Sequence, residues 1–146
     1  MSGQSTRWDL LATRAKLRWQ EAQRDVVQAK EALEAARRRQ QQVQHMVNAY
    51  HERAQQRHRS SRLVGDVSLG MNFLGQLGAV LHGAEREVAT CERRLTRAQA
   101  LAADARLALE KMKQLDQRQS QRQSDLAKKK EQHGFDQLAL MRYHGR

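Results

Sequence analysis

Apolar residues recur along the first part of the chain at alternating steps of four and three residues. Of the fourteen positions in this stripe, only Gln40 is polar. The stripe consists of Trp8, Ala12, Ala15, Trp19, Ala22, Val26, Ala29, Leu33, Ala36, Gln40, Val43, Val47, Tyr50 and Ala54. A mean step of 3.5 residues keeps one side of a helix facing one partner, as in a coiled coil. The pattern predicts a first helix over about residues 6–58, with Ser5 or Thr6 as its N-cap.

The same pattern resumes after an interruption and stops before the chain ends. Residues 59–70 contain three serines, two glycines and an aspartate, which predicts a turn or an irregular tip. A second apolar stripe predicts a second helix over about residues 71–142. Its members are Leu74, Leu77, Leu81, Ala84, Val88, Cys91, Leu95, Ala98, Ala102, Ala105, Leu109 and Met112. Polar residues then take the next seam positions, which are Asp116, Gln119 and Gln123.

Two long helices joined by a short tip pair within one chain only by folding back antiparallel. With the turn near residue 64, the numbers of paired residues add up to about 128, if helical rise holds throughout. Trp8 then lies opposite Gln119, where the second stripe has already ended. The sequence predicts an all-α fold, a single antiparallel coiled-coil hairpin over residues 1–146 whose C-terminal helix extends beyond the N-terminus. The tail, residues 120–146, is expected to be a free helix or partly disordered. A dimer of two chains is the competing architecture, because heptads do not identify the partner.

Composition agrees with long helices and excludes several classes of protein. The chain has 146 residues, no proline and only two residues each of Phe, Trp and Tyr. Proline breaks helices, so its absence fits uninterrupted ones, and so few rings cannot fill a large core. A mean hydropathy of −0.89 argues against a membrane span. A single cysteine excludes an internal disulfide, and we expect a cytoplasmic protein.

The net charge of +11 is concentrated in two bands. Residues 37–62 carry a net charge of +6 and residues 111–146 one of +5, whereas residues 63–110 carry −1. The densest clusters are three arginines at 37–39 and three lysines at 128–130. Such bands are either solvated surface or steer association with an acidic protein, nucleic acid or lipid surface. Aromatic residues that would stack on bases do not alternate with the basic ones, which disfavours nucleic acid.

No catalytic, cofactor-binding or metal-binding residues are expected. The chain has no glycine-rich phosphate loop. Cys91 lies on the apolar stripe, whereas a reactive thiol needs exposure and a nearby cation. No two of the six histidines are three or four residues apart, the spacing that brings two ligands onto one helical face.

The region beside the tip combines apolar residues with glycines. The assumed register places Tyr50 near Gly78, with Phe73 close by. Four glycines fall in this segment, namely Gly70, Gly75, Gly78 and Gly83. Each interior glycine weakens a helix by up to about 1 kcal/mol relative to alanine. Their clustering indicates close helix approach, a frayed first turn or a shallow apolar surface for a partner, and a wide apolar stripe there favours the last.

Two segments near the C-terminus resemble the end of the flagellar export protein FliJ. The sequence LDQRQS at 115–120 resembles the family pattern L-x-E-R-Q-S. After a basic stretch, FDQLA at 135–139 resembles the block hydrophobe-D-E-x-A. Gln117 and Gln137 stand where the family often has glutamate. Stalk proteins of virulence type III secretion are similar.

The resemblance implies a fold and a role. FliJ proteins are antiparallel two-helix coiled coils without catalytic activity. They insert into the hexameric ring of the export ATPase, contact the cytoplasmic domain of the membrane export gate and handle export chaperones. The implied location is the cytoplasm, peripheral to the inner-membrane export apparatus. The alternatives are a stalk or general secretion chaperone of a virulence system and a basic coiled-coil protein associated with nucleic acid.

The resemblance also implies partner-binding residues. We call the expected gate contact the tip patch, which consists of Val43, Val47, Tyr50, Phe73, Leu77, Val80 and Ala84. We expect residues of the basic C-terminal part to contact the ATPase ring, and these are Arg118, Arg122, Lys128, Lys129, Lys130, Phe135 and Arg142. Ala54 stands where a second family tyrosine is expected, which weakens or shifts the gate contact.

Overall fold

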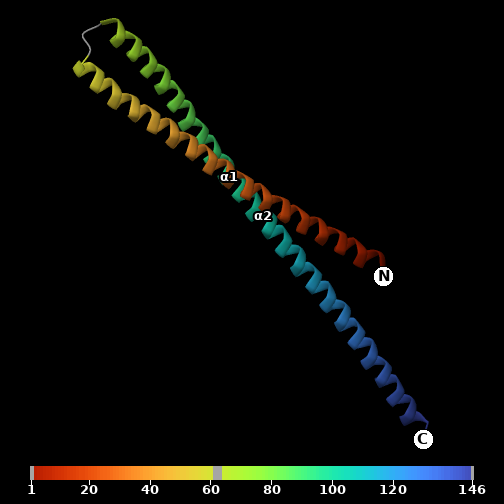
Figure 1. Cartoon of the computed structure of the whole chain (residues 1–146). Coiled ribbons are helices and arrows are strands. Elements are labelled where there is room, and N and C mark those ends of the chain that lie inside the picture. Colours follow the sequence, from red (N-terminus) through yellow and green to blue (C-terminus); the bar gives the residue numbers. More distant parts are fainter. Residues whose placement is uncertain (1, 61–63, 146) are drawn as a thin grey trace. The chain divides into compact units, whose positions relative to one another are not determined.

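The protein consists of two long α-helices, seen in a computed structural model that describes residues 2–60 and 64–145 (Figure 1). Helix α1 spans Ser2–Ser60 and helix α2 spans Val64–His144. Neither helix contains proline, and Arg, Lys, Glu, Gln and Ala, which are strong helix formers, fill most positions between the apolar ones. The two helices pack against each other as an antiparallel hairpin, so the predicted all-α fold is confirmed.

The helices are longer than the sequence pattern predicted. The N-cap expected at Ser5 or Thr6 is wrong, because α1 begins upstream of both residues. The irregular tip expected over residues 59–70 is also wrong at both ends, because α1 includes residues 59–60 and α2 includes residues 64–70. The rest of that segment lies outside the described residues. Adding residues to an existing helix needs no new nucleus, so a few serines and glycines do not end it.

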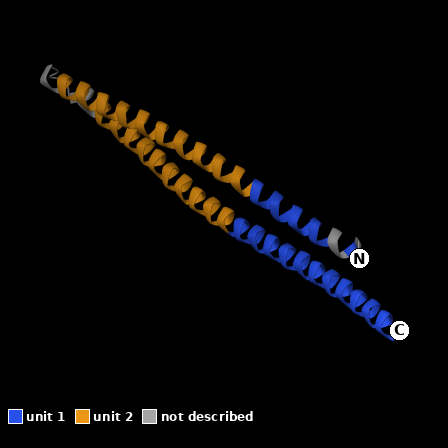
Figure 2. Cartoon of the chain, turned by 90° about the horizontal axis from the view of Figure 1, so that it is seen from below, with its two compact units in different colours: residues 1–20, 104–146 blue, residues 21–103 orange. Residues whose placement is uncertain are grey.

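The chain forms two compact units (Figure 2). Unit 1 contains Met1–Gln20 and Asp104–Arg146, and unit 2 contains Glu21–Ala103. Each unit therefore includes a segment of both helices. That residues 1–146 act as a single domain stays a prediction.

Unit 2 is built around a narrow seam of small and medium-sized side chains. Its core cluster consists of Leu33, Ala36, Val88 and Cys91, with Leu95 packed against it. Two ion pairs join the helices beside this cluster, Arg39–Glu87 at 3.0 Å and Arg37–Glu92 at 3.6 Å. The numbers of the paired residues add up to 126 and 129, close to the predicted 128. The antiparallel register is therefore confirmed in this unit.

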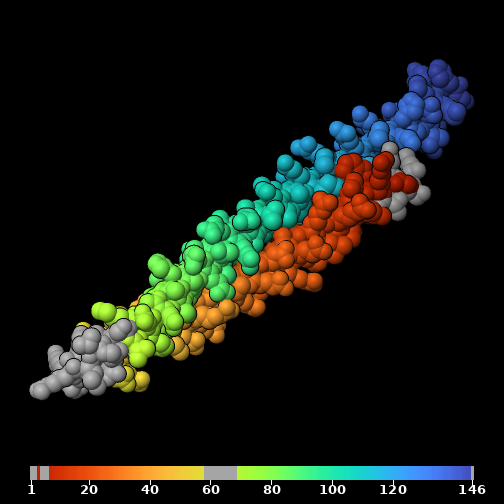
Figure 3. All heavy atoms as spheres, turned by 90° about the horizontal axis from the view of Figure 1, so that it is seen from above, coloured from red at the N-terminus to blue at the C-terminus, as the bar shows by residue number. Residues whose placement is uncertain are grey.

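Unit 1 contains both a paired stretch and a bare one. Half-buried or buried positions continue along α2 from Ala105 through Leu109 and Met112 to Gln119. Over residues 120–145, every residue except Gly134 is exposed. Figure 3 shows the blue end of α2 continuing past the red segment of α1. The tail is thus an α-helix through His144 with nearly every described residue exposed, the first of the two states expected for it.

Candidate interaction surfaces

Two aromatic rings pack together near the tip end of unit 2. The centroids of the Tyr50 and Phe73 rings are 4.8 Å apart, and the ring planes are inclined by 54°. The Tyr50 hydroxyl donates a hydrogen bond of 3.5 Å to the carbonyl oxygen of Gly70. Phe73 is therefore close to Tyr50 as expected, but the phenol reaches Gly70 rather than Gly78. Packing on Phe73 directs the hydroxyl toward the start of α2.

Only part of the tip patch is accessible to a partner. Phe73 is 46 % exposed and Val80 is 55 % exposed. Val47 is buried in the seam. The other four members are half-buried between the helices, namely Val43, Tyr50, Leu77 and Ala84. The accessible surface therefore centres on Phe73 and Val80, and the remaining residues chiefly hold the helices together.

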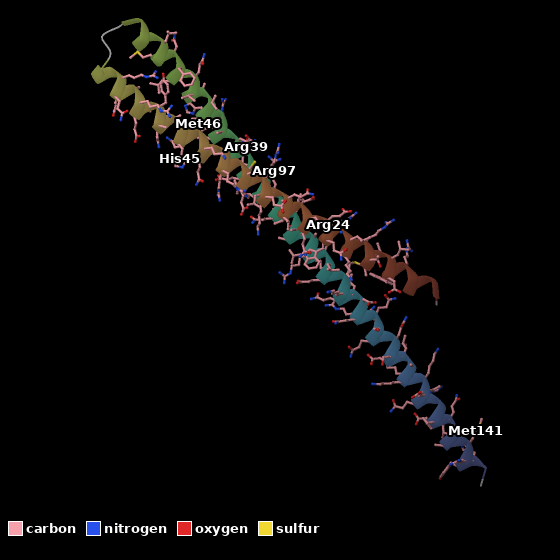
Figure 4. All side chains as sticks on the ribbon, viewed as in Figure 1. Arg24, Arg39, His45, Met46, Arg97 and Met141 are labelled. Atoms are coloured by element: carbon pink, nitrogen blue, oxygen red, sulfur yellow. The ribbon has the colours of Figure 1, made fainter. Side chains whose placement is uncertain are left out.

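The structure adds Met46 to this accessible surface. Met46 is 60 % exposed and lies one turn before Tyr50 on α1. Figure 4 shows Met46 and Arg39 along the same stretch of α1. A spacing of seven residues separates these two, so they lie on the same side of the helix. The sequence contained this seven-residue spacing between Arg39 and Met46. The prediction of the tip patch followed the apolar stripe, which contains Val43 and Val47 but not Met46.

The glycines near the tip are not explained by close approach of the helices. A Cβ atom added to Gly75, Gly78 or Gly83 would meet no neighbouring atom within 4 Å. Gly70 differs, because its added Cβ would lie 3.3 Å from the Tyr50 hydroxyl oxygen. Gly75, Gly78 and Gly83 therefore lower the helical stability of this part of α2 without a compensating contact.

The basic C-terminal residues are all exposed, but they do not form one patch. Successive residues of a helix point about 100° apart, so the three lysines at 128–130 face different directions around α2. Arg118, Arg122 and Lys129 fall on one side of the helix by this spacing. Phe135 and Arg142, seven residues apart, share another side. An open depression there is lined by Phe135, Leu138, Ala139, Arg142 and Tyr143.

The described part of the chain holds no cluster of metal-ligating side chains. Within it, no three His, Cys, Asp or Glu side chains gather as they would around a metal ion. Cys91 is buried in the core of unit 2 and packs as an apolar residue. No helix in the described part of the chain is both long enough and apolar enough to cross a membrane.

Comparison with known proteins agrees with this architecture. The model of the family described as "Flagellar FliJ protein" matches residues 4–146, nearly the whole chain. No curated protein and no solved structure matches this chain. The family match spans both helices and the tail. The chain therefore belongs to the flagellar FliJ protein family, whose function lies in flagellar protein export and is not enzymatic.

Proposed function

We propose that this protein is a noncatalytic stalk and adaptor of the flagellar type III export apparatus. In this proposal the tail and the paired end next to it sit in the hexameric ring of the export ATPase. The tip patch contacts the cytoplasmic domain of the membrane export gate, and export chaperones bind the same protein. The protein is cytoplasmic and associates peripherally with the inner-membrane export apparatus through the gate. The observation that carries the proposal is the bare helix over residues 120–145.

A bare helix suits the inside of a ring for geometric reasons. A single α-helix with its side chains is only about 10–12 Å wide. Lys128, Lys129 and Lys130 face different directions around it, so cations meet whichever subunit surface surrounds the helix. The net charge of +5 over residues 111–146 would attract acidic surfaces within the ring. Contact with one subunit at a time would couple ATP hydrolysis to export.

The accessible part of the tip patch suits a protein surface at the gate. Phe73, Val80 and Met46 each leave about half of an apolar residue exposed near the tip end of unit 2. Exposed apolar surface of this kind marks binding sites in soluble proteins. The contact with chaperones rests on the family match alone.

Charge reversal in the tail tests the proposal. We expect replacement of Lys128, Lys129 and Lys130 by glutamate to abolish stimulation of the cognate export ATPase, because attraction to the ring becomes repulsion. A matched control reverses three exposed charges in unit 2, away from the end assigned to the ring, by replacing Arg93, Arg94 and Arg97 with glutamate. Helicity by circular dichroism should be the same in all three proteins. If the tail variant stimulates hydrolysis as well as the original chain does, the tail has no part in the mechanism.

A further inference from the structure

Four residues near the C-terminal end of α2 form a hole on one side of the helix. Phe135, Leu138, Ala139 and Arg142 are spaced i, i+3, i+4 and i+7, which makes them neighbours on the helix surface. Together with Tyr143 they line the open depression described above. In a coiled coil, a hole formed by four such neighbours receives one side chain of the facing helix. The tail therefore presents the kind of hole that a second helix fills.

The same side of the tail is apolar in its middle and oppositely charged at its two ends. Phe135 is 70 % exposed and Leu138 is 58 % exposed. Glu131 lies four residues before Phe135, and Arg142 lies four residues after Leu138. Among the described residues, no hydrogen bond or ion pair engages Glu131 or Arg142. The steps of four, three and four residues are those of the core positions of a coiled coil.

A glycine and a long side chain lie along one edge of these core positions. Gly134 and Met141 are seven residues apart, so they lie on the same side of the helix. A Cβ atom added to Gly134 would meet no neighbouring atom within 4 Å, so packing among the described residues does not require a glycine here. Met141 is 73 % exposed (Figure 4). The glycine weakens the helix but leaves room for a long side chain of a facing helix.

We propose that this side of the tail binds the same side of a second copy of the chain, with the two tails antiparallel. In one register, the numbers of facing residues add up to 273. Phe135 then packs on the partner's Leu138, and Glu131 pairs with the partner's Arg142. Twofold symmetry makes each of these contacts occur twice. The second copy thus supplies an apolar side chain for the hole and an opposite charge for each free charge.

The residues beside the core positions fit the same register. Met141 lies across the partner's Gly134, where the absence of a side chain leaves space for it. Lys128 is the remaining charged residue of this side for which the structure describes a side chain. It lies at the end of the interface near the partner's Gly145, where its ammonium group reaches water. Lys129 and Lys130 face away from the partner, because successive residues point about 100° apart.

Charge favours this arrangement over the other ones. Parallel tails would bring Glu131 against the partner's Glu131 and Arg142 against the partner's Arg142. An antiparallel register shifted by seven residues would place Phe135 opposite the partner's Gly145 or the partner's Glu131. An anionic lipid surface would attract Arg142 but repel Glu131, whereas a second copy pairs with both. The interface is short, so the dimer dissociates on dilution and leaves the bare tail described above.

Charge reversal tests the proposal by sedimentation equilibrium of the full chain, whose monomer mass is 16.9 kDa. Glu131→Arg and Arg142→Glu should each weaken dimerisation about tenfold or more, because like charges then meet twice in every dimer. Glu131→Arg/Arg142→Glu in one chain should restore the dimer, and so should mixing the two single variants. The controls Asp136→Arg and Lys130→Glu reverse charges off this side and should change dimerisation less than about twofold. Circular dichroism checks that each variant remains helical.

Three results would overturn the proposal. The first is a chain that stays monomeric at its highest soluble concentration, and binding of that monomer to anionic lipid vesicles through Arg142 would assign this side to a lipid surface. The second is a pair of single variants that dimerise as well as the original chain. The third is a double variant that does not dimerise, because restoration requires residue 131 of one copy to meet residue 142 of the other.

This inference does not rest on the proposed function, because the dimer is measured with the chain alone. If the chain dimerises as predicted but replacement of the lysines at 128–130 by glutamate leaves stimulation of the ATPase unchanged, the dimer stands and the ring assignment falls. If that replacement abolishes stimulation but the original chain is monomeric, the ring assignment stands and the dimer falls.

Discussion

Helix α2 passes through two environments that its residue types alone do not distinguish. Around Val88 and Cys91 its apolar stripe is covered by Leu33 and Ala36 of α1. Over residues 120–145 the same helix continues with nearly every side chain exposed. In both stretches the strong helix formers Arg, Lys, Glu, Gln and Ala are common, and both stretches are helical. Helical propensity therefore sets where α2 forms, whereas the apolar seam decides which part of it pairs with α1 and which part stays exposed.

The largest contrast between the two stretches should come from leucine truncation. Leu33→Ala removes a buried side chain from the core cluster and should lower the free energy of unfolding by about 2–3 kcal/mol. Leu126→Ala removes the same atoms from an exposed position of the tail and should cost less than about 0.5 kcal/mol. Urea unfolding followed by circular dichroism measures both. Similar losses for the two variants would mean that the tail is buried against something in solution.

Replacing glutamine by leucine sharpens the same contrast. Gln40 is the one polar residue of the α1 stripe and is half-buried in unit 2. Gln40→Leu should raise the free energy of unfolding by about 1 kcal/mol, because apolar atoms replace an amide in the seam. Gln123 takes a seam position of α2 but is exposed. Gln123→Leu should therefore change stability by less than about 0.3 kcal/mol, and an equal gain at both sites would contradict the unpaired tail.

The glycines near the tip provide a smaller test within unit 2. Gly75→Ala and Gly78→Ala should each stabilise the protein by about 0.5–1 kcal/mol, because alanine fits the open space and favours the helix. Gly70→Ala should gain less, since its methyl group crowds the Tyr50 hydroxyl. Thermal unfolding of the three variants measures the difference. Destabilisation by Gly75→Ala or Gly78→Ala would show that α1 approaches these residues closely.

Much of the hairpin was predictable because a 3.5-residue stripe reports burial directly. Leu33, Ala36, Val47, Val88 and Cys91 all lie on the predicted stripes and are all buried. The end of the α2 stripe after Met112 also predicted where pairing weakens. Both results depend only on local spacing, which the sequence contains in full.

The tip and its patch were harder to predict for a physical reason. Serine and glycine lower helical propensity without forbidding a helix, so the segment around residues 64–70 is helical despite its composition. Stripe positions such as Val43 and Leu77 were assigned to the tip patch, although packing between the helices covers much of them. Met46 lies just off the stripe and is exposed. Which edge of a seam stays open depends on the register of both helices together.

Hydrogen exchange of backbone amides tests most directly whether the tail is free. Amides near Val88 and Cys91 exchange only when the paired helices open, whereas those over residues 120–145 need only local fraying of one bare helix. We predict exchange at least about a hundredfold faster in the tail than in the core of unit 2. Equal protection along the whole of α2 would contradict the account, because it would require the tail to be covered in the isolated protein.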